Sequence, residues 1–426
     1  MSKDSLLFMT IESSAEQTTP PHLFMPDSVK KIGQHDPLPD TGSALVELDS
    51  LDVALTLGEH VLFFATDDTH VNTMLRIANH CPSHTFVVHA TLDLHARPAL
   101  DGAGVDYVIH TADMVEFAQA DIALMGNDVG WEERLFILRC REKRIPTVSL
   151  QESTNVDFYG WPWRMQWADV TFIQGVYTLK RHSRQLMFLT GNPRFDEIQL
   201  SPLPEQPRVL INCNFTFGIG VGWGRAWVEQ VIVVSKSLGL EYAVTVHPRD
   251  ETDLSGIEHV LPSNAFKIHE QLAESSVLIS RDSSLPYEAA MMGRHVIYYN
   301  SFNEPEYWLN NDDTGLIQQC YTPEDLKQVL SDTIQSAIHL VGKGQALSDV
   351  FTGVDGLNHA RVAQAIKILC QRGNDWKTSD ARAHGYFHTW LQMHLQNVWR
   401  PRIRQIVPLR WIWKCGKCLV GGYRRT

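Results

Sequence analysis

The chain has 426 residues, of which 44% are hydrophobic and 20% are charged, and its formal net charge is −12. This composition is typical of a folded protein and excludes a largely disordered one. The acidic balance argues against a general nucleic-acid binder, which would carry a basic surface. The length exceeds what a single core usually supports and predicts two domains of roughly 150–200 residues each.

Membrane-spanning and secretory patterns are absent from the sequence. The longest hydrophobic runs, at 61–65 and 231–234, are far shorter than the roughly 20 residues of a transmembrane helix. Residues 1–17 include three acidic residues and do not resemble a secretory signal. The seven cysteines lie mostly in hydrophobic segments, as reduced core residues do, so we expect a cytoplasmic protein.

Residues 1–57 are rich in proline and polar residues and are expected to form an irregular extension. After them, short hydrophobic runs alternate with amphipathic segments. Strands are predicted at 60–66, 84–90, 105–111, 120–126, 145–151 and 168–175, and helices at 67–81 and 130–144. We interpret residues 58–190 as a Rossmann-like domain that binds the acceptor.

A second alternation follows residues 191–208, which have three prolines between 202 and 207 and are typical of a linker. It predicts strands at 209–215, 241–247, 277–280 and 295–299, and helices at 226–239, 268–275, 285–293, 323–340 and 358–371. Short hydrophobic strands that alternate with helices indicate parallel sheets covered on both faces. The sequence therefore predicts an α/β fold with two facing Rossmann-like domains, the second at 209–372 and binding a nucleotide donor, followed by a helical C-terminal tail at 373–426.

The first candidate site is the turn after the strand 277–280. Asp282, Ser283 and Ser284 precede a predicted helix, and Glu288 lies about one turn inside it. Ligands of open parallel sheets bind beyond the carboxyl ends of the strands, where a helix begins. Serine hydroxyls there can donate to a phosphate, and Glu288 can accept from ribose hydroxyls. The alternative is an ordinary helix N-cap.

A second candidate is His247, which ends the strand 241–247 and is followed by Pro248 and Arg249. An imidazole that is held at a strand end suits stabilisation of a phosphate leaving group, although a histidine in this position can also be purely structural. We assign Arg249 to the nucleotide site with it.

Two further segments carry candidate residues. Glu152 follows the strand 145–151 and could act as a base or as a nucleophile on a sugar carbon, unless it is a solvated loop residue. Asn214 and Gly218 lie in a glycine-rich stretch between a strand and a helix, where glycine lets the backbone approach a diphosphate. No glycine register there fits the dinucleotide fingerprint, so the stretch gives only weak support to NAD binding.

Three segments together resemble a known group of enzymes: TGNPRFD (190–196), TVHPRD (245–250) and ISRDSSLPYEAAMMGRHVIYY (279–299). They are similar to motifs of bacterial surface-polysaccharide transferases with the two-domain GT-B fold, among them CDP-glycerol glycerophosphotransferases and capsule or O-antigen Kdo transferases. The resemblance covers about residues 60–370. It implies that His247-Pro248 and Asp282-Ser283-Ser284 bind the nucleotide phosphates.

The chain departs from the glycerophosphotransferases at one informative place. Where they have a catalytic His in a Trp-His-Gly turn, this chain has Gln151-Glu152-Ser153, and Kdo transferases resemble that arrangement. The resemblance implies a glycosyltransferase that moves a sugar, best matched by Kdo from CMP-Kdo, onto a lipid-linked glycan of the capsule or lipopolysaccharide. A CMP-linked sugar nucleotide would be the co-substrate, with no other cofactor. No metal-ligand pattern stands out, and the lone C-x-x-C at 415–418 does not predict zinc.

The tail after Asp380 has nine Lys or Arg residues and no acidic residue, and Trp399, Trp411 and Trp413 are interspersed among them. Basic and aromatic residues together favour the surface of an anionic bilayer. We therefore expect peripheral attachment to the inner membrane, where lipid-linked acceptors lie. A C-terminal helix that packs across both domains would be the structural alternative.

Three other functions stay open at this point. A CDP-polyol phosphotransferase would use the same phosphate site. A sugar-nucleotide epimerase of the same architecture would need neither a lipid acceptor nor a basic tail, and a non-catalytic scaffold of a polysaccharide assembly complex would not need Glu152. A single carboxylate serves both retaining and inverting transfer, so the sequence does not decide the stereochemistry.

Overall fold

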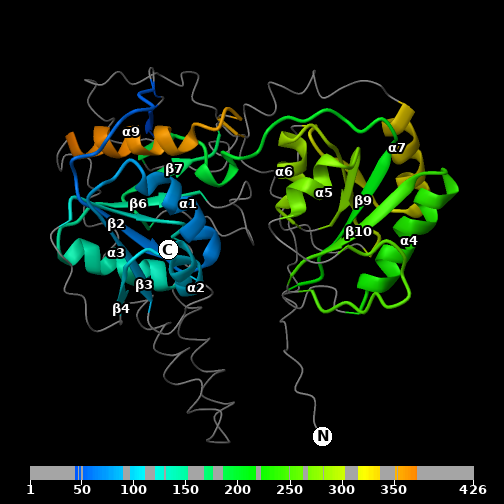
Figure 1. Cartoon of the computed structure of the whole chain (residues 1–426), viewed down its shortest axis with the longest axis horizontal. Coiled ribbons are helices and arrows are strands. Elements are labelled where there is room, and N and C mark those ends of the chain that lie inside the picture. The colour runs from blue at the N-terminus through cyan, green and yellow to red at the C-terminus, as the bar shows by residue number, and fades with distance from the viewer. Residues whose placement is uncertain are drawn as a thin grey trace, which may run out of the picture. The chain divides into compact units, whose positions relative to one another are not determined.

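The computed structural model contains two β-sheets, each built of parallel strands and each with helices on both faces (Figure 1). It describes residues 44–46, 48, 51–89, 96–110, 120–128, 131–151, 167–175, 186–216, 222–248, 250–261, 267–281, 283–302, 315–335, 351–352 and 354–371. The expected tail at 373–426 and most of the expected extension at 1–57 lie outside these residues. No helix within the described ranges is long and apolar enough to cross a membrane.

The first sheet has eight strands in the order β1-β8-β7-β6-β5-β2-β3-β4, all paired in parallel. Their bounds are β1 Ala44–Val46, β2 Val61–Ala65, β3 His84–His89, β4 Tyr107–His110, β5 Ile122–Met125, β6 Thr147–Leu150, β7 Val170–Ile173 and β8 Leu186–Leu189. The helices of this domain are α1 Asp68–Ala78, α2 Ala96–Ala103, α3 Trp131–Glu142 and α9 Asn358–Gln371.

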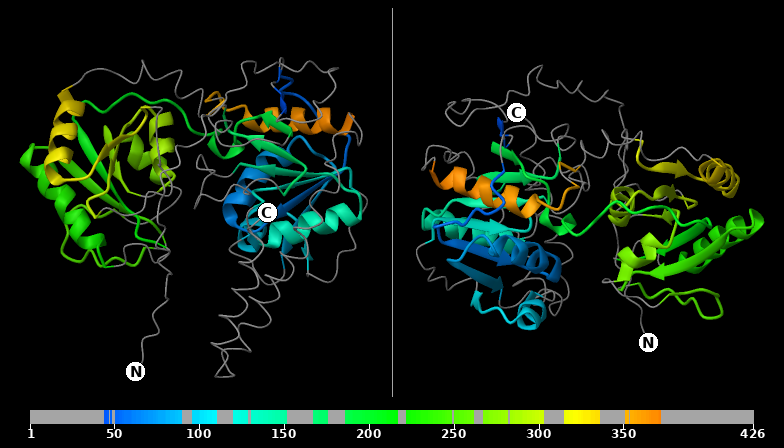
Figure 2. Two further views of the ribbon diagram at one scale, coloured as in Figure 1. Left: turned by 180° about the vertical axis from the view of Figure 1, so that it is seen from behind. Right: turned by 45° about the horizontal axis from the view of Figure 1, so that its top comes forward.

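Alternate residues of β2 explain how both faces of this sheet are covered. Phe63 packs into the cluster that holds residues of α1, α2 and α9, whereas Leu62 and Phe64 pack into the cluster that includes Phe136 of α3. Phe64 stacks on Phe136 with ring centroids 4.2 Å apart. Strands that are hydrophobic on every residue therefore lie between two layers of helix, and Figure 2 shows this sheet from two further directions.

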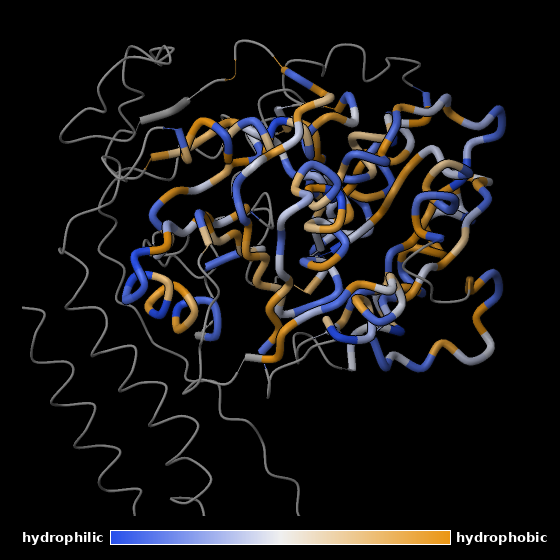
Figure 3. Tube along the Cα trace, turned by 60° about the vertical axis from the view of Figure 1, so that its left-hand side comes forward, coloured by the Kyte–Doolittle hydropathy of each residue, from blue (hydrophilic) through white to orange (hydrophobic). Residues whose placement is uncertain are grey.

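The second sheet has five parallel strands in the order β10-β9-β11-β12-β13. Its strands are β9 Arg208–Cys213, β10 Glu241–Val246, β11 Val277–Ser280, β12 His295–Tyr299 and β13 Gln318–Cys320, and its helices are α4 Gly224–Ser237, α5 Ile268–Ala273, α6 Leu285–Met291 and α7 Pro323–Gln335. Residues of α4 and α7 share one core cluster and residues of α5 and α6 share the other. Along the trace, helical turns alternate between hydrophobic and hydrophilic residues (Figure 3).

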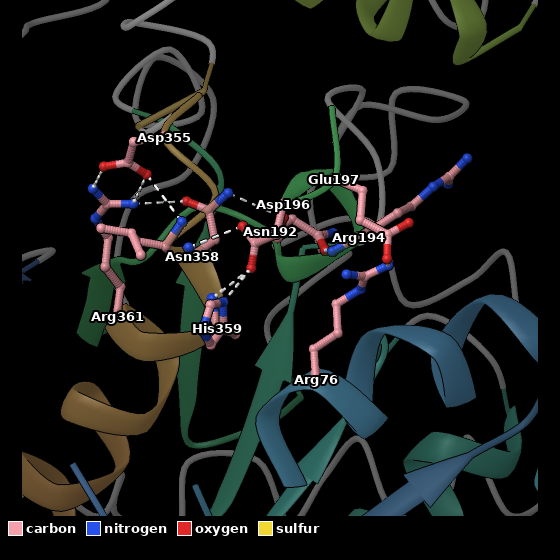
Figure 4. Close-up of polar contacts among 10 residues, drawn as sticks. Arg76, Asn192, Arg194, Asp196, Glu197, Asp355, Asn358, His359 and Arg361 are labelled. Carbon is pink, nitrogen blue, oxygen red and sulfur yellow. Dashed lines mark hydrogen bonds and ion pairs between the residues drawn. The ribbon is translucent and has the colours of Figure 1, made fainter. Parts of the chain in front are cut away.

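The segment TGNPRFD, which the sequence singled out, has a structural role at the start of the linker. It forms a short 3-10 helix, η3 Pro193–Phe195. Asp196 just after it accepts hydrogen bonds from the backbone N–H groups of Asn358 and His359, both at 2.9 Å, so it caps α9 from a distant part of the chain (Figure 4). The imidazole Nδ1 of His359 lies 2.8 Å from the same carboxylate.

Two elements lie in a different domain from the one expected. Helix α9, which the sequence assigned to the domain 209–372, packs Val362, Ile366 and Leu369 into the core of the first sheet. Strand β1, which falls in the expected irregular extension, pairs with β8 at the edge of that same sheet. Both elements join the first domain through contacts with distant segments, which local sequence patterns do not predict.

Candidate nucleotide site at the carboxyl edge of the second sheet

The strand order of the second sheet places a switch point between β9 and β11. From β9 the chain continues to β10 on one side, and then crosses over to β11 on the other side. Open α/β sheets bind ligands at the carboxyl ends of the two strands that flank such a point. The loops to consider are therefore 214–216 after β9 and 281–284 after β11, which are the two places that the sequence singled out.

Buried polar side chains lock these two loops together. The amide of Asn212 donates to the hydroxyl of Ser280 at 2.9 Å across the pair β9–β11. The guanidinium of Arg281 donates to the carbonyl of Asn214 and lies 4.1 Å above the ring of Phe215. Arg281 is only 2% exposed, so a cation is buried between the two loops and holds them side by side.

His247 lies beside this pair at the end of β10. Its backbone N–H donates to the carbonyl of Cys213 at 2.9 Å, so the strand pairing with β9 continues as far as the histidine. Asp250 then turns back and accepts from the backbone N–H of Phe215 at 2.7 Å. Burial alone would raise the pKa of Asp250, but hydrogen bonds from Thr252 and Phe215 outweigh it and lower that pKa.

The two serines after β11 make different contacts. The hydroxyl of Ser283 accepts from the backbone N–H of Leu285 at 3.2 Å. Ser284 occupies the N-cap position of α6, yet its side chain makes no capping hydrogen bond. The ordinary capping alternative therefore fits Ser283, which bonds a first-turn N–H, and does not describe Ser284, which is partly exposed.

Glu288 is 4% exposed, and its carboxylate pairs with two half-buried side chains. One carboxylate oxygen accepts from Arg194 at 2.8 Å and the other lies 2.8 Å from Nε2 of His269. Because a carboxylate only accepts, Nε2 of His269 carries the proton. Burial would raise the pKa of Glu288, but the charge of Arg194 and the hydrogen bond from His269 lower it below its usual value.

Four of the predicted site residues fall outside the described residues: Glu152, Gly218, Arg249 and Asp282. The structure does describe the peptide that precedes Glu152. The carbonyl of Gln151 accepts from Asn192 at 2.8 Å and from Gln174 at 3.1 Å, so the end of β6 is fixed by two side chains.

The sequence missed three residues that organise this region: Arg281, Arg194 and His269. Arginine is rarely buried, so nothing marked Arg281 as the residue that joins the loops. Arg194 and His269 reach Glu288 from distant segments, and such pairings have no local signal. Within the described part of the chain, no group of three or more His, Cys, Asp or Glu residues is arranged to hold a metal ion.

No protein-family model and no curated protein matches the sequence. Among solved structures, a protein assigned as a UDP-N-acetylglucosamine 2-epimerase from Listeria monocytogenes is similar, with a TM-score of 0.55 and 14% identity over 74% of this chain and 98% of that one. S. aureus MnaA, solved with UDP, has a TM-score of 0.52 and 11% identity over 74% of this chain and 97% of its own. A UDP-GlcNAc 2-epimerase from Neisseria meningitidis, solved with UDP-GlcNAc, has a TM-score of 0.50 and 11% identity over 73% of this chain and 99% of its own.

Similarity at these identities establishes the fold. The chain has the two-domain α/β architecture of GT-B type that the sequence predicted, with a parallel sheet in each domain.

Proposed function

We propose that the protein acts on a nucleotide sugar and binds the nucleotide at the carboxyl edge of the second sheet. The observation that carries this proposal is the junction of Arg281 with Asn214, which fixes the two loops at the β9–β11 switch point next to each other. The hydrogen bond and the ring contact of this buried cation hold the two loops rigidly. The similarity of the fold to S. aureus MnaA, solved with UDP, and to an epimerase solved with UDP-GlcNAc supports a nucleotide sugar as the ligand.

Within this site the residues take the following roles in the proposal. Ser283 and Ser284 donate to the phosphates, and His247 stabilises the leaving phosphate. Glu288 accepts from the ribose. The proposal also assigns four residues to nucleotide binding on sequence grounds: Asn214, Gly218, Arg249 and Asp282. The hydroxyl of Ser284 supports its role because it makes no capping bond to α6.

The reaction we propose is transfer of the sugar to a hydroxyl of a glycan acceptor. Glu152 acts as the base that deprotonates the acceptor, or as the nucleophile at the anomeric carbon. The two hydrogen bonds to the carbonyl of Gln151 support this role, because they fix the backbone immediately before Glu152. CMP-Kdo is the preferred donor, on the resemblance of Gln151-Glu152 to the Kdo transferases. A CDP-polyol donor is the alternative that uses the same phosphate site.

The test is a thermal-shift panel with CMP, CDP, UDP and GDP. A ligand at about 100 times its dissociation constant adds about 2.7 kcal/mol to the unfolding free energy. Stabilisation by CMP alone supports a Kdo-like donor, stabilisation by CDP supports polyol-phosphate transfer, and stabilisation by UDP or GDP indicates a hexose-type sugar. If no nucleotide stabilises the protein, the proposal of a nucleotide site is wrong.

A second candidate function, sugar-nucleotide epimerisation, is favoured by the comparisons, because the similar structures with a TM-score of 0.50 or more include epimerases. An epimerase converts UDP-N-acetylglucosamine to its 2-epimer without an acceptor. A transferase releases the nucleotide and needs an acceptor for turnover of the sugar. Product analysis by NMR with UDP-N-acetylglucosamine as the sole substrate separates the two functions.

The non-catalytic scaffold is separated from both enzymes by a single variant. If Glu152 acts in catalysis, Glu152→Gln abolishes glycan production in cells while protein level and nucleotide affinity stay unchanged. A scaffold would support glycan production with either residue.

We also propose that the basic aromatic tail attaches the protein to an anionic membrane surface, where the lipid-linked acceptor lies. Each Lys or Arg near such a surface contributes about 1 kcal/mol. Replacement of Arg400, Arg402 and Arg404 with Gln should therefore release the full-length protein from vesicles that contain phosphatidylglycerol. Unchanged co-sedimentation would contradict the proposed membrane contact.

A further inference from the structure

The helix that follows β9 begins with an exposed tryptophan at the carboxyl edge of the second sheet. Trp223 occupies the N-cap position of α4 and is 43% exposed. Helix N-caps are usually Ser, Thr, Asp or Asn, whose side-chain oxygens accept from N–H groups of the first turn. An indole has a donor and no acceptor, and Trp223 makes no capping hydrogen bond. Stability of the helix therefore does not account for a tryptophan in this position.

An aromatic ring from a second loop packs against Trp223. Phe302 follows β12, and its ring centroid lies 4.9 Å from that of Trp223, with 34° between the ring planes. In the sheet, β9 and β12 are the two neighbours of β11. The two aromatic residues therefore come from loops on either side of the strand that Ser283 and Ser284 follow.

Buried aromatic residues hold this exposed pair in place. Trp227 lies one turn after Trp223 in α4, is fully buried, and donates through Nε1 to the carbonyl of Tyr299 at 2.9 Å. The ring of Trp227 also lies 6.0 Å from the ring of Tyr299 and 6.0 Å from the ring of Phe215, centroid to centroid. The start of α4 is thus joined to β12 and to the loop after β9. Trp223 and Phe302 extend this aromatic layer to the surface.

The aromatic pair and Glu288 belong to opposite faces of the sheet. Leu210 and Ile211 of β9 point into different core clusters, one with residues of α5 and α6 and the other with residues of α4 and α7. Figure 1 shows these two pairs of helices on the two sides of the sheet. Phe302 packs against the cluster of α4 and α7, whereas Glu288 lies on α6. A ligand that runs from Glu288 across the sheet edge therefore reaches the side of Trp223.

We propose that Trp223, supported by Phe302, stacks on the sugar ring of the donor. The inference rests on the proposed function, in which the ribose lies at Glu288 and the phosphates lie at the serine loop, and it adds a binding residue for the sugar. One face of a pyranose ring presents C–H groups, which pack against the electron-rich face of an indole and require no charge on the ligand. The contact favours donors that carry a ring, and an open-chain polyol gains little from it.

The test compares variants that keep or remove the aromatic ring. Trp223→Phe keeps a ring, whereas Trp223→Leu keeps a large apolar side chain without one. Val233→Ala is the matched control, because Val233 is a large exposed hydrophobic residue nearer the other end of the same helix. Titration calorimetry on the full-length proteins uses three pairs of ligands: UDP with UDP-N-acetylglucosamine, GDP with GDP-mannose, and CMP with CMP-N-acetylneuraminate. CDP with CDP-glycerol is the pair without a sugar ring on the transferred group.

We expect at least one of the three nucleotide sugars to bind the wild-type protein and to bind Trp223→Leu about fivefold more weakly, the loss of one aromatic contact. Its Kd should stay close to the wild-type value in Trp223→Phe and Val233→Ala. The Kd of the parent nucleotide should be the same in all four proteins. If Trp223→Leu does not fold, Trp223→Ser decides in its place, because serine is a favoured N-cap residue.

Three results would overturn the inference while the proposed function stands. The first is an unchanged Kd of the nucleotide sugar in Trp223→Leu. The second is an equal weakening of the parent nucleotide or of CDP-glycerol, which would show that the ring does not act on the sugar. The third is an equal loss in Trp223→Phe and Trp223→Leu. Absence of binding by every nucleotide and nucleotide sugar would instead reject the proposed function, and the inference with it.

Discussion

The two sheets organise their carboxyl edges in different ways, although both are parallel and both have a switch point beside a central strand. In the second sheet, Arg281 bonds the backbone of Asn214, so a side chain holds two loops together. In the first sheet, Glu133, Thr66, His70 and Asn127 bond one another through side chains. The first arrangement positions a stretch of backbone, and the second positions a single amide.

Glutamates near the two edges also differ in their acidity. Burial and the neighbouring charge of Glu133 raise the pKa of Glu132 to about 7. Burial would likewise raise the pKa of Glu288, but Arg194 and His269 lower it. A buried carboxylate therefore titrates according to its partners, and the partner charge decides the direction of the shift.

The largest expected effect comes from adding one methyl group at each edge. In Gly126→Ala the new Cβ meets the buried His70 ring at 2.0 Å, and in Gly224→Ala it meets the hydroxyl of Thr252 at 2.3 Å. Overpacking costs about 1–3 kcal/mol. We expect Gly126→Ala to lose more, because the rigid imidazole ring is held at both nitrogens, whereas the smaller threonine side chain is held by its hydrogen bond to Asp250.

Chemical denaturation measures these losses. Gly102→Ala is the matched control, since nothing lies within 4 Å of its Cβ in α2, and it should stabilise the helix by up to about 1 kcal/mol. Equal stability of Gly126→Ala and the wild type would contradict the packing at the first edge.

Removal of the cation that pairs with the buried Glu288 is expected to rank next. Arg194→Met leaves Glu288 with His269 alone and should lower the unfolding free energy by about 2 kcal/mol, in the range for a hydrogen bond to a charged group. The control is Arg208→Met, which removes a pair with the exposed Glu274 and should cost under about 0.5 kcal/mol. A similar cost for both variants would show that burial of Glu288 is unimportant.

Glu132 predicts a pH dependence of stability. Its pKa rises from 4.5 to about 7 on folding, so the folded state binds the proton more tightly. The stabilisation from the protonated form is complete below pH 4.5 and is lost as the pH rises through about 7. Glu288 has the opposite sign: its lowered pKa stabilises the fold above pH 4.5, and this contribution is lost in acid.

We expect Glu132→Gln to flatten the decline in unfolding free energy between pH 4.5 and 7. Denaturation curves across this range measure it. Glu142→Gln, which removes an exposed glutamate from the same helix, controls for the loss of a charge from α3. A decline as steep in Glu132→Gln as in the wild type would contradict the shift.

Much of the fold could be predicted because strands buried on both faces are hydrophobic along their whole length. Runs such as VLFFA and VLIS therefore identified β2 and β11. The short edge strands β1 and β13 have three residues each and no clear pattern. Helix α9 was predicted at its observed bounds. The domain to which it belongs could not be predicted, because the cap from Asp196 joins residues that are 162 positions apart.

The candidate site could be predicted in position but not in its contacts. Parallel topology places Asn214, His247 and Ser283 at one edge, and enough strands could be predicted to infer that edge. The buried Arg281 and the ion pair of Arg194 with Glu288 depend on side chains that approach after folding. His70 belongs to the helix predicted at 67–81, and no neighbouring residue in the sequence indicates its contact with Asn127.

The measurement that tests the central claim most directly is the affinity of the best-stabilising nucleotide for Ser284→Ala and Ser237→Ala. Ser237 is the control because it is the last residue of α4, at the end of the helix away from the proposed site. Its hydroxyl donates to the carbonyl of Val234 at 2.8 Å. A hydrogen bond to a phosphate is worth about 1.5–3 kcal/mol, so titration calorimetry should show at least a tenfold weaker Kd for Ser284→Ala and an unchanged Kd for Ser237→Ala. The same Kd in both variants would contradict the placement of the nucleotide at this edge.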